Sequence, residues 1–125
     1  MSRIKAREKA FQFLFQLDLN EIDLTSKPEF AEEFVQDPFS KQLIDGVMKH
    51  KEEIDLVISK HLENWTIHRL ASVEKTALRL ATYEILYMDD IPVAVSINEA
   101  INIANRFGSE QSGKFVNGVL SKIIK

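Results

Sequence analysis

The sequence contains no cysteine, and this absence excludes several chemistries. Without cysteine the chain can form no disulfide framework, thiol nucleophile or cysteine-ligated zinc site. It also has no run of about eighteen apolar residues, which a membrane-spanning helix would need, and no apolar segment follows its basic N-terminus, MSRIKAREKA. We therefore expect a cytoplasmic protein with no place in a membrane.

Glycine and proline are also scarce, with four and three among 125 residues, too few for the many turns of a β-sandwich. The apolar residues, 45% of the chain, recur instead at helical intervals. We expect a single all-α domain over residues 1–125. This interpretation places helices near residues 2–18, 28–36, 38–62, 73–88, 97–107 and 111–124. The helix at 73–88 is apolar on most sides, which predicts a central position.

Several helix ends can be located from capping residues. Asp37 is a good N-cap for the helix that starts near residue 38. Ser96 and Glu99 have the spacing of a capping box, in which each side chain satisfies the backbone N–H of the other. Gly108 is expected to end the helix that follows them. In the last helix, Gly118 is expected to allow a close approach between helices.

No constellation of residues indicates catalysis. The three histidines, His50, His61 and His68, lie eleven and seven residues apart, so they form no i, i+4 ligand pair. The segment from Gly108 to Phe115 matches a phosphate-binding P-loop only until Phe115 replaces the Ser or Thr that would hold magnesium, and it follows a helix instead of a strand. We interpret it as a turn between helices. The sequence thus indicates no enzyme, no metal site and no cofactor.

The charge is unevenly distributed, although the net charge is only −3. A negative chain is unlike most free-standing nucleic-acid-binding proteins. The first nine residues nevertheless contain a basic cluster, formed by Arg3, Lys5, Arg7 and Lys9. Lys5 and Lys9 share the polar face of the first helix, while Arg3 and Arg7 fall toward the edge of its apolar arc. The cluster could bind phosphates, or it could be an ordinary solvated face.

A series of short motifs occurs along almost the whole chain, from about Arg3 to Ile123. They are Ala6-Arg7-Glu8, Trp65 with Arg69-Leu70, Glu74-Lys75 with Leu78-Arg79-Leu80-Ala81 and Tyr83-Glu84, Pro92 with Ser96-Ile97-Asn98-Glu99-Ala100, Phe107-Gly108, and Lys114-Phe115-Val116-Asn117-Gly118-Val119-Leu120. Together they resemble the NusB family of bacterial transcription antitermination factors. The segments INEA and KFVNGVL are the most specific part of this resemblance.

The resemblance implies an all-α protein of about seven helices in two small subdomains, which binds RNA without catalysis. In this family the protein pairs with a small-subunit ribosomal protein, NusE. The pair binds single-stranded boxA RNA of ribosomal RNA leader transcripts and helps RNA polymerase to avoid termination. We therefore expect three kinds of partner: boxA RNA, NusE and the antitermination complex of RNA polymerase.

The resemblance also implies two binding surfaces. An N-terminal RNA-binding stretch maps onto Arg3, Lys5 and Arg7, and a second part of the RNA surface maps onto a turn from Gln111 to Phe115. The expected RNA-binding residues are Arg3, Lys5, Arg7, Lys9, Gln111, Ser112, Lys114 and Phe115. The expected partner-binding residues are Phe15 and Glu74. Lysine can replace arginine in a phosphate contact, but without its bidentate geometry.

Two alternative functions stay open. The chain could be a free-standing NusB-like accessory domain that acts with a ribosomal RNA methyltransferase, since it contains no glycine-rich cofactor loop of its own. It could also be a helical protein-interaction module without RNA binding. A homodimer that hides the basic cluster is a further possibility.

Overall fold

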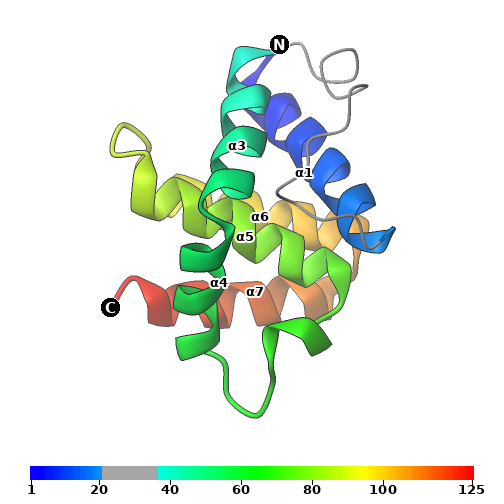
Figure 1. The fold of residues 1–125 in the computed structure, drawn as a ribbon, viewed down its shortest axis with the longest axis vertical. Coiled ribbons are helices and arrows are strands. Elements are labelled where there is room, and N and C mark those ends of the chain that lie inside the picture. The colour runs from blue at the N-terminus through cyan, green and yellow to red at the C-terminus, as the bar shows by residue number, and fades with distance from the viewer. Residues whose placement is uncertain (21–36) are drawn as a thin grey trace.

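The computed structural model describes residues 1–20 and 37–125, and all regular structure in these ranges is helical. The helices are α1 (Arg3–Leu19), α3 (Pro38–Lys49), α4 (Lys51–Lys60), the short 3-10 helix η1 (Ile67–Arg69), α5 (Ser72–Tyr87), α6 (Val93–Phe107) and α7 (Glu110–Ile123) (Figure 1). The predicted all-α class is confirmed for this part of the chain. The helix expected at 28–36 lies outside the described residues. No helix in the described ranges is both long and apolar enough to cross a membrane.

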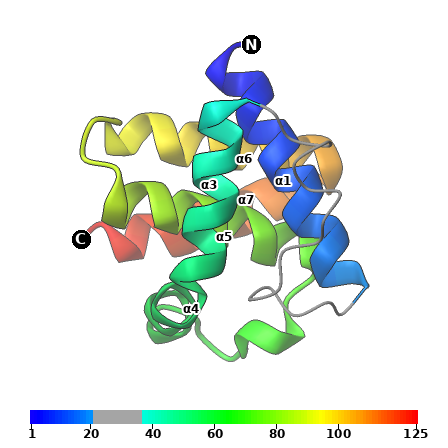
Figure 2. The same cartoon turned by 45° about the horizontal axis from the view of Figure 1, so that its top comes forward.

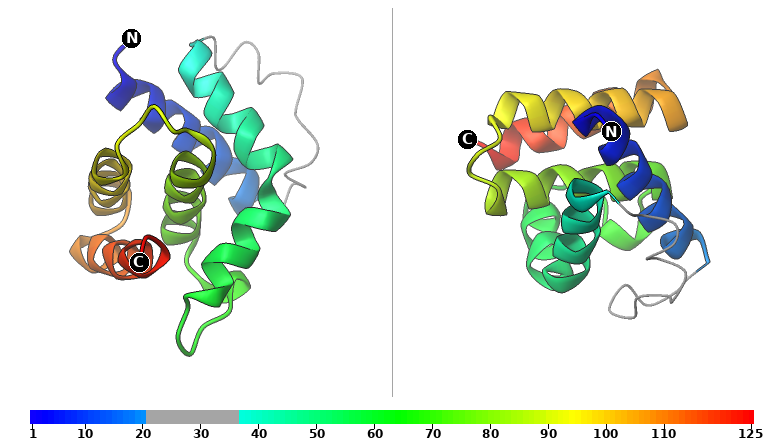
Figure 3. Two further views of the ribbon diagram at one scale, coloured as in Figure 1. Left: turned by 90° about the vertical axis from the view of Figure 1, so that its left-hand side faces the viewer. Right: turned by 90° about the horizontal axis from the view of Figure 1, so that it is seen from above.

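Helix α5 lies in the middle of the fold. It contacts α1, α3 and α4 on one side and α6 and α7 on the other (Figure 3). Every residue from 76 to 84 is buried, because this stretch of α5 is covered all round by other helices. The predicted central helix at 73–88 is therefore confirmed. The buried side chains of the surrounding helices join those of α5 in one continuous core.

The single helix expected at 38–62 is wrong, because the chain changes direction at His50. This residue ends α3 and precedes α4, with φ −105° and ψ 17° (Figure 2). Helix α3 packs against α1 and α5, whereas α4 packs against α5 and α7. One straight helix could not reach both sets of neighbours. The start of α3 is as expected, since the carboxylate of Asp37 accepts hydrogen bonds from the backbone of Phe39 and Ser40, each at 3.0 Å.

The capping box expected at Ser96 and Glu99 is also wrong. Helix α6 begins earlier, at Val93, directly after Pro92. Ser96 is buried inside the helix, where its hydroxyl donates a hydrogen bond of 2.9 Å to Glu84 on α5. A tertiary hydrogen bond has thus replaced the local one that the S-x-x-E spacing suggests. Ser109 and Ser112 form a capping box at the start of α7 instead.

The glycine that allows a close approach is not the expected one. A Cβ atom on Gly118 would meet nothing within 4 Å. A Cβ atom on Gly113 would instead lie 1.9 Å from the side-chain oxygen of Asn105 on α6. The side chain of Asn105 thus occupies the space beside Gly113, and a residue with a Cβ atom there would displace this exposed amide.

A polar cluster joins α1 to the central helix. The carboxylate of Asp18 accepts a hydrogen bond from the hydroxyl of Ser72 and lies 3.3 Å from the ammonium of Lys75. The guanidinium of Arg79 lies 3.6 Å from the same carboxylate and donates two hydrogen bonds, of 2.8 and 3.0 Å, to Asp55 on α4. These contacts fix the C-terminal half of α1 beside the start of α5.

Candidate nucleic-acid interface

Exposed cations lie along the first half of α1. Ser2 caps this helix, since its hydroxyl accepts a hydrogen bond of 3.2 Å from the backbone of Lys5. Lys5 and Lys9 are exposed and lie one helical turn apart, so they project from the same face. Arg3 is also exposed, and its guanidinium lies 3.7 Å from the carboxylate of Asp90. We call Arg3, Lys5 and Lys9 the basic strip.

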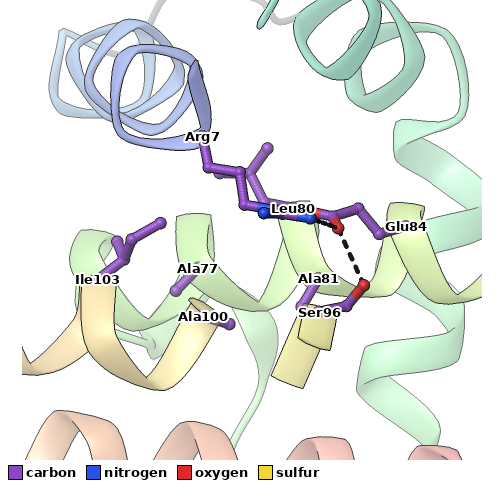
Figure 4. Close-up of a pocket in the computed structure, with 8 residues that line it drawn as sticks. All are labelled: Arg7, Ala77, Leu80, Ala81, Glu84, Ser96, Ala100 and Ile103. Carbon is purple, nitrogen blue, oxygen red and sulfur yellow. Dashed lines mark hydrogen bonds and ion pairs between the residues drawn. The ribbon is translucent and has the colours of Figure 1, made fainter. Parts of the chain in front are cut away.

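Arg7 does not belong to this strip. Its side chain is only 3% exposed and donates two hydrogen bonds, of 2.8 and 2.9 Å, to the carboxylate of Glu84 (Figure 4). A buried guanidinium held in this way is not available to a phosphate. The prediction that Arg7 contacts RNA is therefore wrong. The residue lies at the edge of the apolar arc of α1, and its partner lies on another helix. The sequence pattern of α1 alone could not show that pairing.

The second expected RNA-binding segment is helical and not a turn. The connection from α6 to α7 is formed by Gly108 and Ser109, and the residues from Gln111 to Phe115 belong to the first turns of α7. Gln111 and Lys114 are exposed, so they can reach a ligand in solvent.

The two other predicted RNA-binding residues of this segment, Ser112 and Phe115, face inward. Ser112 is buried, its hydroxyl accepts a hydrogen bond from the backbone N–H of Ser109, and its own backbone N–H donates to the hydroxyl of Ser109. Phe115 is partly buried and packs against the core. Ser112 therefore shapes the start of α7, and Phe115 offers only part of its ring to a base.

Two contacts place the end of α6 beside α1. The rings of Phe11 and Phe107 stack with their centres 5.1 Å apart. The guanidinium of Arg106 binds the carboxylate of Glu8. The side chain of Arg106 is 68% exposed, so it adds a cation near the basic strip. The sequence gives no signal for this role, because only the contact with Glu8 on α1 brings Arg106 to this surface.

The expected partner-binding residues lie on the two helices that Asp18 joins. Phe15 lies on α1 one turn before Asp18, is partly buried and stacks on Phe11 with ring centres 5.4 Å apart. Glu74 lies in the first turn of α5 and is partly buried. Burial raises the pKa of the Glu74 carboxyl above its ordinary value. This carboxylate forms no ion pair or hydrogen bond with the described residues, so it is open to an external cation.

The histidines show no ligand arrangement in the described part of the chain. His50 stacks on Tyr87 with ring centres 4.1 Å apart, and a ring nitrogen of His61 lies 2.8 Å from the carbonyl oxygen of Val57. The described residues contain no cluster of His, Asp and Glu side chains that could hold a metal ion.

Comparisons with known proteins point to one family. The sequence model of the NusB family matches residues 4–125. The chain is 62% identical to the transcription antitermination protein NusB of Oceanobacillus iheyensis, over 99% of both chains. It is 52% identical to the protein of that name from Bacillus subtilis, over 98% of this chain and 95% of the relative.

Solved structures give the same result. The fold is similar to T. maritima NusB, with a TM-score of 0.86 and 41% identity over 98% of this chain and 90% of that chain. It is also similar to a chain in a crystal structure of the antitermination factors NusB and NusE in complex with dsRNA. The TM-score there is 0.77, with 33% identity over 98% of this chain and 97% of that chain.

Proposed function

This chain belongs to the NusB family, and we propose that it is a transcription antitermination factor that binds RNA together with the ribosomal protein NusE. Its RNA target is single-stranded boxA RNA in ribosomal RNA leader transcripts, and the bound pair helps RNA polymerase to avoid termination. The identity of 62% over nearly the whole of a NusB protein carries this proposal. Such a protein acts in the cytoplasm, where bacterial transcription takes place, and it acts by binding.

The basic strip is the proposed site for the RNA backbone. Lys5 and Lys9 project from one face of α1. Both are exposed, so a phosphate in solvent can approach them. Lys114 and Gln111, both exposed at the start of α7, form the second part of this surface. Cations that bind phosphates give affinity without base preference, because every nucleotide carries the same phosphate.

A second protein is needed to complete the site. The net charge of −3 opposes binding of a polyanion, and the basic strip contains only three side chains. NusE would add further cations, and Glu74 is the proposed contact for one of them. A partly buried carboxylate without a partner of its own is costly in the free protein, and a cation from another chain would remove that cost. Phe15 is the proposed apolar contact on the neighbouring helix.

An RNA titration with and without NusE tests the shared site. We expect boxA RNA to bind the chain alone weakly, and NusE to strengthen binding by at least about tenfold, or about 1.4 kcal/mol. Fluorescence anisotropy of a labelled RNA measures both affinities. Equal affinity with and without NusE would contradict the shared site, and absence of RNA binding in both cases would favour a module that only binds proteins.

A charge reversal tests the partner contact. Glu74→Arg should lower the affinity for NusE by about 2 kcal/mol or more if the carboxylate pairs with a cation at a desolvated interface. Glu52→Arg reverses an exposed charge on α4 and serves as the matched control. Calorimetric titration with NusE measures the affinities, and circular dichroism checks the helical content. Equal effects of the two variants would remove Glu74 from the partner surface.

The accessory-domain alternative is less well supported. The chain covers 99% of the Oceanobacillus iheyensis relative, so that protein has no room for a methyltransferase domain. That relative is a transcription antitermination protein, and antitermination is the function proposed here.

A further inference from the structure

A cavity of about 110 Å³ opens between α1 and α6, beside the basic strip. Two of its residues come from α1 and four from α6. They are Ile4, Glu8, Glu99, Asn102, Ile103 and Arg106. Ile4 and Glu8 are four residues apart, and Asn102 and Ile103 lie three and four residues after Glu99, with Arg106 a further turn along, so the positions on each helix share one face. The cavity is therefore a gap between two helix faces.

The cavity is continuous with the proposed path of the RNA backbone. Ile4 and Glu8 form its wall on α1, and each is followed directly by a lysine of the basic strip, Lys5 or Lys9. Consecutive residues of a helix point about 100° apart, so the lysines lie on the neighbouring stripe of the same helix. A phosphate bound to either lysine would hold its nucleotide at the edge of the cavity.

The lining combines apolar surface with unused polar groups. Ile4 and Ile103 supply the apolar part, which suits the flat face of a base. Glu8 is already bound by Arg106, so its charge is compensated. Glu99 and Asn102 form no hydrogen bond or ion pair with any residue in the described ranges. The rim thus offers one carboxylate and one amide to a ligand.

We propose that this cavity receives one unstacked guanine base of the bound RNA, with Glu99 and Asn102 as the groups that select it. The inference rests on the proposed RNA-binding function and adds a base-specific site to it. Guanine is the one common RNA base that presents two adjacent N–H donors, N1–H and the 2-amino group, which match the two oxygens of a carboxylate. The amide of Asn102 can donate to the guanine O6 or N7 acceptor.

The charges of the cavity favour a base over the other ligands of this surface. Two carboxylates, Glu8 and Glu99, line it against the single cation of Arg106. A phosphate would be repelled there, while the lysines on the adjacent stripe attract it. A base is neutral and carries N–H donors, so it can enter the cavity while its phosphate stays outside.

The test compares RNA molecules that differ in one base. The probes are labelled oligouridines of about twelve nucleotides, with or without one central guanosine, titrated against the full chain with NusE bound. We expect the guanosine to strengthen binding about tenfold, as one bidentate contact to a base commonly does. Glu99→Gln removes one of the two acceptor oxygens at nearly constant size and should reduce the preference to about twofold or less.

Two further variants complete the design. Glu52→Gln removes the same charge from the exposed surface of α4, so it corrects for the general gain in RNA affinity and should keep the full preference. Asn102→Ala changes an exposed side chain on α6, so it should fold normally and also lose most of the preference. Thermal unfolding of each variant verifies the fold.

The outcomes separate this inference from the proposed function. Tight binding of both probes with no preference for guanosine would overturn the base site and leave RNA binding intact. The inference would also be overturned by a preference that Glu99→Gln and Asn102→Ala leave unchanged. If Asn102→Ala weakens the binding of NusE instead, the cavity receives a side chain of the partner and the base site is wrong. Binding of neither probe by a complex that still binds boxA RNA would overturn the inference alone, whereas failure to bind boxA RNA as well would overturn the proposed function.

Discussion

Arg7 and Glu84 lie 77 positions apart in the sequence and form a bidentate ion pair inside the core, with hydrogen bonds of 2.8 and 2.9 Å. The hydroxyl of Ser96 donates a third hydrogen bond to this carboxylate, so the pair connects α1, α5 and α6 (Figure 4). A cavity of about 10 Å³ beside it has about the room that one water molecule needs. The pair therefore holds the helix of the basic strip against the rest of the fold.

Removing one member of the pair should destabilise the protein strongly. Arg7→Met keeps most of the apolar stem but leaves the carboxylate of Glu84 buried without its cation. The expected loss is about 3–5 kcal/mol in the free energy of unfolding, measured by urea denaturation. Arg3→Met removes an exposed arginine of the same helix and should cost less than about 1 kcal/mol. Adding Glu84→Leu to Arg7→Met should recover much of the loss, and a double variant no more stable than Arg7→Met would contradict this account.

Two glycines should respond to alanine in opposite ways. A Cβ atom on Gly46 would lie 2.1 Å from the ring of Tyr83, which is buried and stacks on Tyr87. Gly46→Ala should therefore cost about 1–3 kcal/mol, because the ring must leave its place. Gly118→Ala meets nothing within 4 Å and should stabilise α7 by about 0.5–1 kcal/mol. The midpoints of thermal unfolding of the two variants provide the comparison. Shifts in the same direction would show that the room for a Cβ atom does not decide whether alanine stabilises the protein.

Much of the fold follows from local sequence patterns. The apolar spacing of α1, α5 and α7 predicts these helices to within a few residues, because each buries one broad face or is surrounded. The break at His50 and the early start of α6 could not be predicted in this way. Both depend on which helices lie nearby, and Ser96 shows this directly, since its capping pattern is overridden by a hydrogen bond to Glu84.

The residues of the candidate site also differ in how well the sequence predicts them. Lys5 and Lys9 are exposed as their positions on the polar face predict. Arg7 and Ser112 are buried, because they have partners that the pattern of charges along the chain does not reveal. Arg106 is not indicated by the sequence, since only the contact with α1 brings it to this surface.

The raised pKa of Glu74 predicts a pH dependence of stability. Its cause is burial, which disfavours the charged form, so the folded chain holds this proton more tightly than the unfolded chain. The resulting stabilisation is complete below the ordinary pKa of 4.5 and is lost as the pH rises through the pKa of the folded state. The stability of Glu74→Gln relative to the parent should therefore be higher at about pH 7 than at about pH 4. This difference should be less than about 1 kcal/mol, because the side chain is partly solvated.

Urea denaturation at the two pH values measures that gain. Glu52→Gln, on the exposed surface of α4, is the control, and its difference from the parent should be about the same at both values. A Glu74→Gln difference that also stays constant would show that burial of this carboxyl does not affect folding. The stability gain should come with a loss of affinity for NusE, since the proposed contact needs the charge.

The last prediction concerns how the basic strip and Lys114 hold RNA. If Arg3, Lys5, Lys9 and Lys114 each bind one phosphate of single-stranded RNA, the slope of log affinity against log salt is about −2.8, and a fourfold rise in salt costs about fiftyfold in affinity. Lys5→Ala should make the slope shallower by about 0.7, whereas Lys49→Ala, an exposed lysine at the end of α3, should leave it unchanged.

Base preference separates this role from that of the cavity. Phosphate contacts carry no sequence information, so Lys5→Ala should weaken oligouridine and its guanosine-containing counterpart by the same factor. Glu99→Gln should change their ratio and leave the salt slope nearly unaltered. Anisotropy titrations of both probes at several salt concentrations measure the two quantities in one experiment. An unchanged slope for Lys5→Ala in the complex with NusE would mean that this lysine is only a solvated surface charge, and the backbone contact would have to be assigned to other cations.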